Sequence, residues 1–399
     1  MICFGPTYPD QWHYVRLVKA LGLTQFKWPD RRLRAKLRYA IGAGLYRVAL
    51  GKNVGRLPYT SVRSIEERAY VGWVRDRLQG CVPIYGPSIQ TYDFPQALPC
   101  WFRKQKVFEG KTIFELTDVV AGPYSGLVWV PGEGIFEESV GSLLRMMGWG
   151  RVLWEALTSA RAHPTDRAVV PCPPLGYFHW VFEVLPNVIH AFKHNPAAVV
   201  LLPPHRATYV DQSLRLALRR NDLPVLLSNS PVRLKRLLLP QVEVFSGFID
   251  QREIALLRDC ILSKVDDGPS EPKLYVSRRR SGQRHMSSED TVEGHLQSRG
   301  YAIVFLEDLA FVDQVRLFRG AKIVVAPHGA GLSNLVWCSP GTRVLEIFPV
   351  NYINDCYARL ASCLGLTYYC LVAVEDGTKW GKMPMDDLGR VLGAPSGGI

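Results

Sequence analysis

The chain has 399 residues and a formal net charge of +12, with 47% hydrophobic and 21% charged residues. Such a composition is typical of a globular protein with a sizeable core, and it excludes disordered and collagen-like chains. The length suits two domains of ordinary size. The sequence offers no apolar stretch close to the roughly 20 residues that a membrane-spanning helix needs.

Two features of the sequence predict a cytoplasmic location. The first residues, MICFGPTYPDQWHYVR, lack the basic start and the apolar core of a signal peptide. The nine cysteines are odd in number and form no CxxC pair, which favours reduced thiols over a disulfide framework.

Positive charge is concentrated at the start of the chain, in a basic N-terminal segment that we set at residues 1–70. Residues 1–60 contain eleven Lys and Arg but only two acidic residues. Such a segment can make a peripheral contact with the inner face of an anionic membrane, or it can pack on the domain and leave its arginines in solvent. We expect no nucleic acid as a partner. The stretch 31–50 places apolar residues at helical spacing: Leu33, Leu37, Ile41, Leu45 and Val48.

Residues 71–265 are predicted to form the first α/β domain. Segments between about 106 and 135 are rich in β-branched and aromatic residues and favour strands, and residues 136–161 favour a helix. Short apolar runs then alternate with amphipathic helices. Strands are predicted at 167–171, 198–203 and 222–227, and helices at 209–221 and 251–265.

The polar segment 266–272 is the predicted linker to a second, Rossmann-like domain at 273–380, and residues 381–399 are a predicted tail. Strands in the second domain are predicted at 273–277, 301–306, 322–327 and 343–349. Strands that alternate with helices indicate parallel sheets, so we expect two doubly wound domains that face each other across a cleft. Ligands of such sheets bind beyond the carboxyl ends of the strands.

The sequence PHGAGLSN follows the strand predicted at 322–327. Gly329 and Gly331 let the backbone turn sharply and approach a ligand closely. A strand, a tight turn and the start of a helix make a place where an anion can bind. We therefore take His328, Ala330 and Asn334, with the two glycines, as candidate ligand-binding residues. A tight turn that binds nothing is the alternative.

The strand predicted at 273–277 runs into the sequence SRRRSGQR. The guanidinium groups of Arg278, Arg279 and Arg284 can bind phosphate, whereas a solvated run of arginines is the alternative. Another charge, Glu346, lies inside the apolar strand 343–349, where an unpaired carboxylate is costly. Its partner is either the hydroxyl pair of a nucleotide ribose or a nearby arginine.

The segment GYFHWVFEVLPN places His179 and Glu183 four residues apart, so a helix brings both to one face. Pro186 predicts that this helix is kinked or begins nearby. Glu183 is a candidate general base for a hydroxyl group, with His179 as its orienting group or as an alternative base. A core histidine and a capping glutamate are the other interpretation.

Several motifs are missing from the sequence. It contains no DxD triplet, no HExxH and no GxxxxGK[ST]. We therefore expect neither a metal-bridged diphosphate nor a P-loop.

In this order, GYFHWVFEVLPN, YVSRRRSGQR, FVDQVRLFRGAKIVVAPHGAGLSNLVW and GTRVLEIFP resemble glycosyltransferase family 61 over about residues 176–349. The resemblance implies a GT-B fold with an acceptor-side first domain. It also implies an inverting, metal-independent and cofactor-free transfer of sugar from a nucleotide sugar, with a UDP-sugar as the expected donor, to a hydroxyl of a glycan or glycolipid. Bacterial members often serve in capsule or lipopolysaccharide assembly, and the lack of an anchor predicts a bacterial-type soluble enzyme.

The resemblance also assigns residues. His179 and Glu183 fall on the family's His-Trp-x-x-Asp motif, with Glu in place of the commoner Asp, and Ser288 stands where the family often has Asn. These departures leave a second hypothesis, a catalytically silent basic surface-binding protein that keeps the nucleotide-sugar fold. The residues that fall on the donor-binding motifs are Ser277, Arg278, Arg284, His328, Gly329, Ala330, Gly331 and Asn334.

Overall fold

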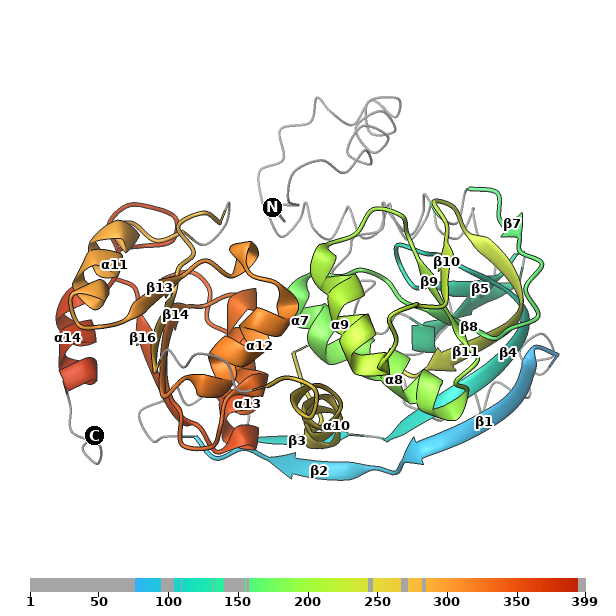
Figure 1. The fold of residues 1–399 in the computed structure, drawn as a ribbon, viewed down its shortest axis with the longest axis horizontal. Helices are drawn as coiled ribbons and strands as arrows, with labels where there is room; N and C mark the ends of the chain where they lie inside the picture. Colours follow the sequence, from blue (N-terminus) through green and yellow to red (C-terminus); the bar gives the residue numbers. More distant parts are fainter. Residues whose placement is uncertain are drawn as a thin grey trace.

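The computed structural model describes residues 76–94, 104–108, 110–131, 133–139, 155, 158–242, 247–266, 272–281 and 285–393. In these residues the chain forms two main sheets with helices around them, one sheet in each half of the molecule (Figure 1). The basic segment 1–70, its predicted helix at 31–50, and Arg284 lie outside the described residues, as does most of the linker at 266–272.

The first sheet is mixed. Strands β10, β9, β8 and β11 run parallel, whereas β4, β5 and β6 continue the sheet from β11 in antiparallel pairs. β1 pairs with β4, and β7 with β11. The bounds are β1 Leu78–Tyr85, β4 Lys111–Ala121, β5 Val128–Val130, β6 Gly134–Phe136, β7 Arg161–Ala162, β8 Val169–Pro171, β9 Val199–Leu202, β10 Val225–Leu227 and β11 Val232–Pro240.

This sheet corrects one of our expectations. The predicted strands at 167–171, 198–203 and 222–227 are confirmed as β8, β9 and β10, but the sheet is not the parallel, doubly wound sheet that we expected. β11 is long and pairs antiparallel with β4 from Val232 to Pro240. Because β11 supplies the central strand between the parallel and antiparallel parts, a strand that the sequence analysis did not predict decides the topology.

The second sheet is parallel, with the order β13-β12-β14-β15-β16. The α/β class and the four strands predicted here are confirmed, and β16 joins them as a fifth. The bounds are β12 Lys273–Val276, β13 Ala302–Val304, β14 Ile323–Pro327, β15 Arg343–Phe348 and β16 Thr367–Val372.

Helices cover both sheets. In the first half they are α7 Tyr177–His179, the π-helix η4 Trp180–Val184, α8 Leu185–His194, α9 Thr208–Leu218 and α10 Gln251–Leu262, after the short 3₁₀-helix η3 Glu137–Ser139. In the second half they are α11 Glu289–Gln297, η5 Leu306–Asp308, α12 Phe311–Gly320, the 3₁₀-helix η6 Ala330–Trp337, α13 Cys356–Leu364 and α14 Met385–Gly393. α14 and the residues before it pack on the folded half, because Met383 and Leu388 are buried in the same hydrophobic cluster as Tyr275 of β12.

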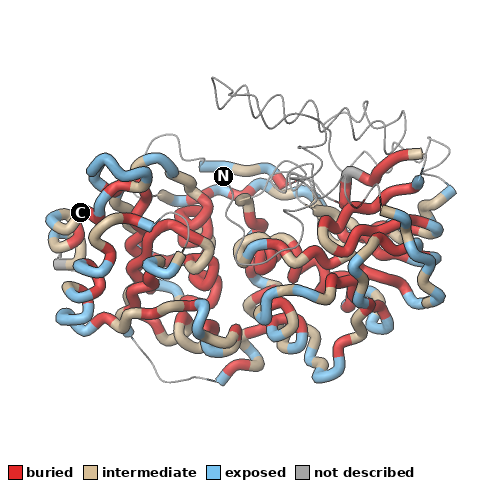
Figure 2. The backbone as a smooth tube through the Cα atoms, turned by 90° about the horizontal axis from the view of Figure 1, so that it is seen from above, coloured by how far each residue is buried: buried red, intermediate tan, exposed pale blue. Residues whose placement is uncertain are grey.

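The two halves share one hydrophobic core. A single cluster of buried side chains extends from Ile113 of β4 to Tyr368 of β16, and Figure 2 shows buried backbone in both halves. Polar contacts also join the two halves along their seam, where α10 meets η6. Arg258 of α10 donates hydrogen bonds to the carbonyl oxygens of Val336 and Cys338. The contact between the halves is therefore packed where α10 meets η6.

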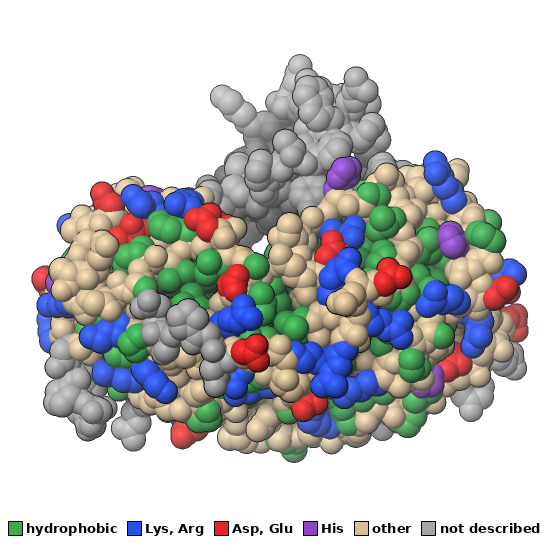
Figure 3. All heavy atoms as spheres, in the orientation of Figure 1, with side chains coloured by type: hydrophobic (Ala, Val, Ile, Leu, Met, Phe, Trp, Pro, Cys, Tyr) green, Lys and Arg blue, Asp and Glu red, His purple; other side chains and the backbone are tan. Residues whose placement is uncertain are grey.

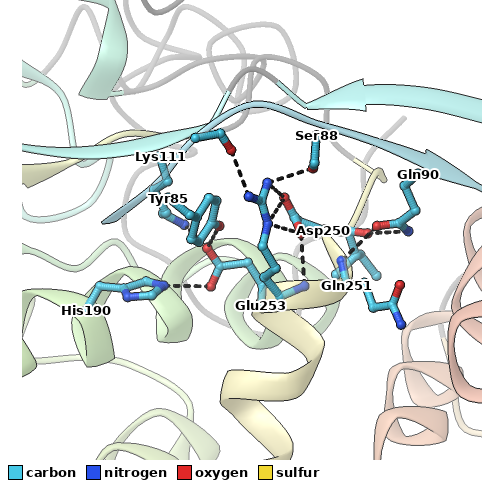
Figure 4. A network of polar contacts seen from close by, with 11 residues as sticks. Tyr85, Ser88, Gln90, Lys111, His190, Asp250, Gln251 and Glu253 are labelled. Carbon is cyan, nitrogen blue, oxygen red and sulfur yellow. Dashed lines mark hydrogen bonds and ion pairs between the residues drawn. The ribbon is translucent and has the colours of Figure 1, made fainter. Parts of the chain in front are cut away.

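A polar network fastens the outer ribbon of the first half to α10 (Figure 4). The ribbon consists of β2 Ser88–Thr91 and β3 Gln105–Phe108, which follow β1 and extend beneath the second half (Figure 1). Glu253 of α10 is buried and binds Lys111 Nζ at 2.6 Å, His190 Nε2 at 3.0 Å and the hydroxyl of Tyr85. This carboxylate thus ties together β1, β4, α8 and α10. The ribbon itself is held by Arg252 of α10, whose Nη2 donates to Ser88 Oγ of β2 at 2.7 Å.

Candidate functional site

The candidate site lies at the carboxyl ends of β12 and β14. In the order β13-β12-β14-β15-β16 the chain moves from β12 to one side of the sheet and then returns to continue on the other side. Ligands of open α/β sheets bind outside the carboxyl ends of the strands at such a reversal. Ser277 and Arg278 follow β12 there, and His328 and Gly329 follow β14.

Arg278 and Gly329 meet across this reversal. A β-carbon added to Gly329 would lie 2.6 Å from Cζ of the Arg278 guanidinium and 3.1 Å from its Nε. Gly329 has an extended backbone with φ 174°, which any residue can adopt, and a side chain at this position would force the guanidinium of Arg278 to shift. The guanidinium also donates a hydrogen bond from Nη2 to Ser281 Oγ at 3.0 Å. The charge of Arg278 is therefore held against the turn that follows β14.

Gly331 and Asn334 make their contacts inside the protein. A β-carbon on Gly331 would lie 2.9 Å from Leu306 Cδ1, so this glycine lets η6 pack closely on its neighbours. Asn334 is fully buried, and its Nδ2 donates to Gln314 Oε1 at 2.9 Å. These contacts shape the turn, and direct contact of the two residues with a ligand stays a prediction. Ala330 is the first residue of η6.

His328 and Glu346 form a buried pair. His328 Nδ1 hydrogen-bonds with Glu346 Oε1, and Tyr368 donates its hydroxyl to Glu346 Oε2. Glu346 is fully buried with both oxygens engaged, so histidine and tyrosine take the place of the ribose or arginine that we expected as its partner. Burial and the charge of Glu346 raise the pKa of Tyr368 well above its usual value, which keeps the phenol a donor. Glu346 is therefore linked to the site by its hydrogen bond with His328.

The side chains of Ser277 and Arg279, on either side of Arg278, contact α11. Ser277 is buried and its Oγ donates to Glu293 Oε1 at 2.6 Å. Arg279 forms an ion pair with the same carboxylate, with 3.2 Å between Nη2 and Oε2, and its guanidinium is half exposed. The structure thus brings Ser277 and Arg278 to the reversal of the sheet and turns Arg279 toward α11.

Glu289 is a site residue that the sequence analysis did not single out. It is buried, and its Oε1 accepts hydrogen bonds from the backbone N–H of Arg278 and, at 3.2 Å, from the hydroxyl of Tyr275. Burial raises the pKa of Glu289 above its usual value. The signal in the sequence was the pair of acidic residues at the start of α11. In the structure this carboxylate positions the backbone of Arg278.

Ser288 has a left-handed backbone, with φ 64°, and makes no capping hydrogen bond through its side chain. Asparagine adopts this conformation more readily than serine does. Serine is therefore less suited than asparagine to the backbone conformation at this position.

His179 and Glu183 lie on one helical face, as predicted. His179 Nδ1 is 2.9 Å from Glu183 Oε2, and both side chains are largely buried. Between α7 and α8 the helix widens into a π-helical turn, in which the N–H of Leu185 donates to the carbonyl of Trp180. The turn precedes Pro186, whose ring would clash with an α-helical carbonyl four residues earlier, and such turns are frequent at functional sites.

The helix that carries this pair packs against η6. Tyr177 donates its hydroxyl to Asn334 Oδ1 at 2.7 Å. Phe178 lies 5.8 Å from the ring of Tyr357, which lies 5.3 Å from the ring of His328. The structure therefore connects the His179–Glu183 pair of the first half with the Arg278–His328 turn of the second through two packed rings.

Two further searches concern only the described residues. In them, no group of three or more His, Cys, Asp or Glu side chains is arranged to hold a metal ion. No helix in this part of the chain is long and apolar enough to cross a membrane.

Comparisons with known proteins cover the segment that builds the site. Residues 177–345 match the family model Glycosyltransferase 61. The chain is 32% identical over 134 residues to Beta-1,2-xylosyltransferase RCN11 of Oryza sativa subsp. japonica, which is 29% of this chain and 25% of that protein. It is 32% identical over 66 residues to Beta-1,2-xylosyltransferase of Arabidopsis thaliana, which is 16% of this chain and 12% of that protein.

The chain thus spans a quarter or less of the length of these two relatives, both of which are plant proteins. The match begins at Tyr177 of α7 and ends within β15, so it includes the described site residues from Tyr177 to Asn334, whereas Glu346, Tyr357 and Tyr368 lie beyond it. The segment that positions His179, Glu183, Arg278 and His328 is accordingly similar to glycosyltransferase family 61.

Proposed function

We propose that this chain is a glycosyltransferase that moves a sugar from a nucleotide sugar to a hydroxyl group of a glycan acceptor. The observation that carries the proposal is the contact between Arg278 and Gly329 at the reversal of the second sheet, next to His328. A guanidinium held there can bind a diphosphate through charge-assisted hydrogen bonds. The match to Glycosyltransferase 61 supports the same chemistry.

The proposed reaction uses both halves of the site. Glu183 accepts the proton of the acceptor hydroxyl, and His179 holds the carboxylate through its Nδ1. The acceptor oxygen forms a bond with the anomeric carbon while the bond from that carbon to the diphosphate oxygen breaks. The nucleoside diphosphate leaves with the bonding electrons, and Arg278 and His328 stabilise its charge. Attack from the side opposite the leaving group inverts the anomeric centre.

The proposal extends to the class of donor and to the source of positive charge at the site. We propose a UDP-sugar as the donor, and the xylosyltransferase names of the relatives favour a pentose over a hexose. We also propose that the transfer needs no metal ion and no cofactor, and that Arg278 and His328 supply the positive charge instead. A role in capsule or lipopolysaccharide synthesis, a bacterial-type enzyme, the GT-B arrangement, a cytoplasmic location, and membrane contact through residues 31–50 remain predictions.

A panel of ligands tests the proposal. Nucleoside diphosphates and nucleotide sugars are added to the whole chain, and the shift in melting temperature is measured. A ligand at 100 times its Kd adds about 2.7 kcal/mol of stability, so the true donor should give a clear shift. Slow hydrolysis of the same nucleotide sugar should follow, because an activated site also uses water as acceptor.

The outcomes separate the two functional hypotheses. A shift with hydrolysis supports the transferase, whereas a shift without hydrolysis or transfer supports the catalytically silent binding protein. Lys and Arg side chains are spread over both halves of the face in Figure 3 and do not gather in one patch, so this face gives the second hypothesis no particular support. No shift with any nucleotide would contradict both.

A further inference from the structure

An exposed aromatic side chain lies beside the candidate site. Tyr352 follows β15, whose carboxyl end adjoins that of β14, and its ring centroid is 5.2 Å from that of His328. Tyr352 is 41% exposed, whereas Phe348 and Tyr357, the other rings packed on His328, are buried. Among the described rings around His328, Tyr352 is the one that a ligand can reach from solvent.

The loop that carries Tyr352 is held at both of its sides. The N–H of Tyr352 donates to the carbonyl of Pro349 at 3.1 Å and closes a turn. Asn351 Nδ2 donates to the carbonyl of Lys379 at 2.9 Å, and Asn354 Oδ1 accepts from the N–H of Cys356 at 2.9 Å. An exposed ring on a fixed loop loses little conformational freedom when it binds a ligand, which favours affinity.

On the opposite side of the site, beyond β12, the described residues include no comparably exposed ring. Phe305 follows β13, on the far side of β12. The guanidinium of Arg280 lies 3.9 Å from the centroid of its ring, and the guanidinium of Arg279 lies 5.6 Å from it. A nucleoside whose phosphates lie at Arg278 must extend toward one flank or the other. Because arginines cover the aromatic face on the β13 flank, the described structure favours the β15 flank, where Tyr352 is exposed.

The proposed general base lies toward Tyr357, so we infer that the transferred sugar lies on the Tyr357 side of His328. Tyr357 connects His328 to Phe178, and Phe178 is next to His179. The sugar must face this connection, because the acceptor hydroxyl is activated there. The nucleobase lies at the other end of the diphosphate, away from Tyr357, and a flat base stacks well on an aromatic ring.

We propose that Tyr352 is the stacking platform for the nucleobase of the donor and so a residue that determines donor affinity. This inference rests on the proposed function, because it needs the diphosphate to bind at Arg278 and His328. It assigns the nucleoside to the β15 flank and the sugar to the α7 side.

Binding of two probes distinguishes a base contact from a phosphate contact. The Kd values of UDP and of inorganic pyrophosphate are measured by calorimetry for the unchanged chain and for Tyr352→Ala, and those of UDP-xylose and GDP are measured alongside. Loss of one stacked base should weaken UDP binding by about 5- to 150-fold, while pyrophosphate binding stays within about twofold. Tyr352→Phe keeps the ring and should bind UDP like the unchanged chain. Val374→Ala, which also truncates an exposed apolar residue of this half, is the control.

The other results overturn the inference in distinguishable ways. Equal losses for UDP and pyrophosphate mean that Tyr352 acts on the phosphate site, for example by holding His328. Unchanged UDP binding together with a loss for UDP-xylose means that the ring contacts the sugar. If the unchanged chain binds pyrophosphate, UDP and GDP not at all, the proposed function fails together with this inference.

Discussion

The guanidinium of Arg278 occupies the space that a side chain at position 329 would need. A β-carbon on Gly329 would approach Cζ of Arg278 to 2.6 Å. One residue follows β12 and the other follows β14, so this contact joins the two loops at the reversal of the sheet. The glycine and the arginine therefore act as one structural unit.

Gly329→Ala should weaken UDP binding by displacing Arg278. The added methyl group cannot occupy the space of the guanidinium, and the arginine has to move away from the turn. We expect a loss similar to that of Arg278→Ala, and little further loss when both changes are combined, because changes that break the same contact are not additive. Calorimetric titration of the two single variants and the double variant measures this.

Gly294→Ala is the matched control for that experiment. Gly294 lies within α11, and nothing comes within 4 Å of a β-carbon placed there. This change should leave UDP affinity unaltered and raise the free energy of unfolding by roughly 0.5–1 kcal/mol, since alanine favours a helix interior over glycine. Additive losses for Gly329→Ala and Arg278→Ala would show that the two residues act separately.

Glu183→Gln should slow sugar transfer without weakening donor binding. The amide keeps the shape of the carboxylate but cannot take the proton of the acceptor, and general-base catalysis contributes about 10²–10⁴-fold. His179→Ala should cost less, because the imidazole holds Glu183 at 2.9 Å and does not itself take the proton. Turnover numbers and UDP affinity are compared for the two variants. Normal turnover in Glu183→Gln with an inactive His179→Ala would reverse the two roles.

Transfer should continue after removal of divalent metal ions. Arg278 and His328 supply positive charge where the diphosphate is proposed to bind, so a bridging Mg²⁺ or Mn²⁺ is not needed there. The rate is measured before and after treatment with EDTA and after each ion is added back. A rate that is lost with EDTA and restored by Mn²⁺ would show that carboxylates of this chain hold a metal in the active state.

Lys111→Met should destabilise the fold at neutral pH. Burial by itself would raise the pKa of Glu253, but the charge of Lys111 and the hydrogen bond with His190 outweigh burial and hold this pKa well below its usual range. Removing the lysine leaves a buried carboxylate without its cation, which costs about 3–5 kcal/mol. Urea unfolding measures the loss, and Lys235→Met, which removes an exposed partner of Asp166, should change little.

The same carboxylate predicts how stability depends on pH. Because the folded state holds the pKa of Glu253 below its unfolded value of about 4.3, its contribution is fully present above that value and is lost as the pH falls further. In Lys111→Met the carboxylate can be protonated more easily, so the difference between the two chains should shrink from pH 7 toward pH 4. A difference that stays constant over this range would show that Lys111 acts by packing alone.

The sequence predicted the parts of the site that depend on local patterns. Apolar runs indicated β12, β14 and β15, and the spacing of His179 and Glu183 indicated a shared helical face, because both signals arise within a few residues. The partners of Glu346 and Asn334 could not be predicted in this way. Tyr368 and Tyr177 approach them only after the sheet and the seam between the halves have formed.

The topology of the first sheet also could not be predicted from local sequence patterns. β11 has the sequence VRLKRLLLP, whose continuous apolar end does not show the alternation of a half-exposed strand. Its pairing with β4, more than a hundred residues earlier, makes the sheet mixed. Single-strand patterns carry no information about such a partner, so β8, β9 and β10 were predicted and the mixed topology was not.

The affinity of UDP for Arg278→Ala, compared with Arg280→Ala, tests the proposed donor site most directly. Arg280 is a neighbouring, half-exposed arginine that pairs with Asp308 and lies on Phe305, so its loss should change the UDP affinity by less than about twofold. Loss of the Arg278 contact should weaken UDP binding by roughly 1.5–3 kcal/mol, which is the range for a charge-assisted hydrogen bond. Equal affinities for the two variants would contradict the placement of the diphosphate at Arg278.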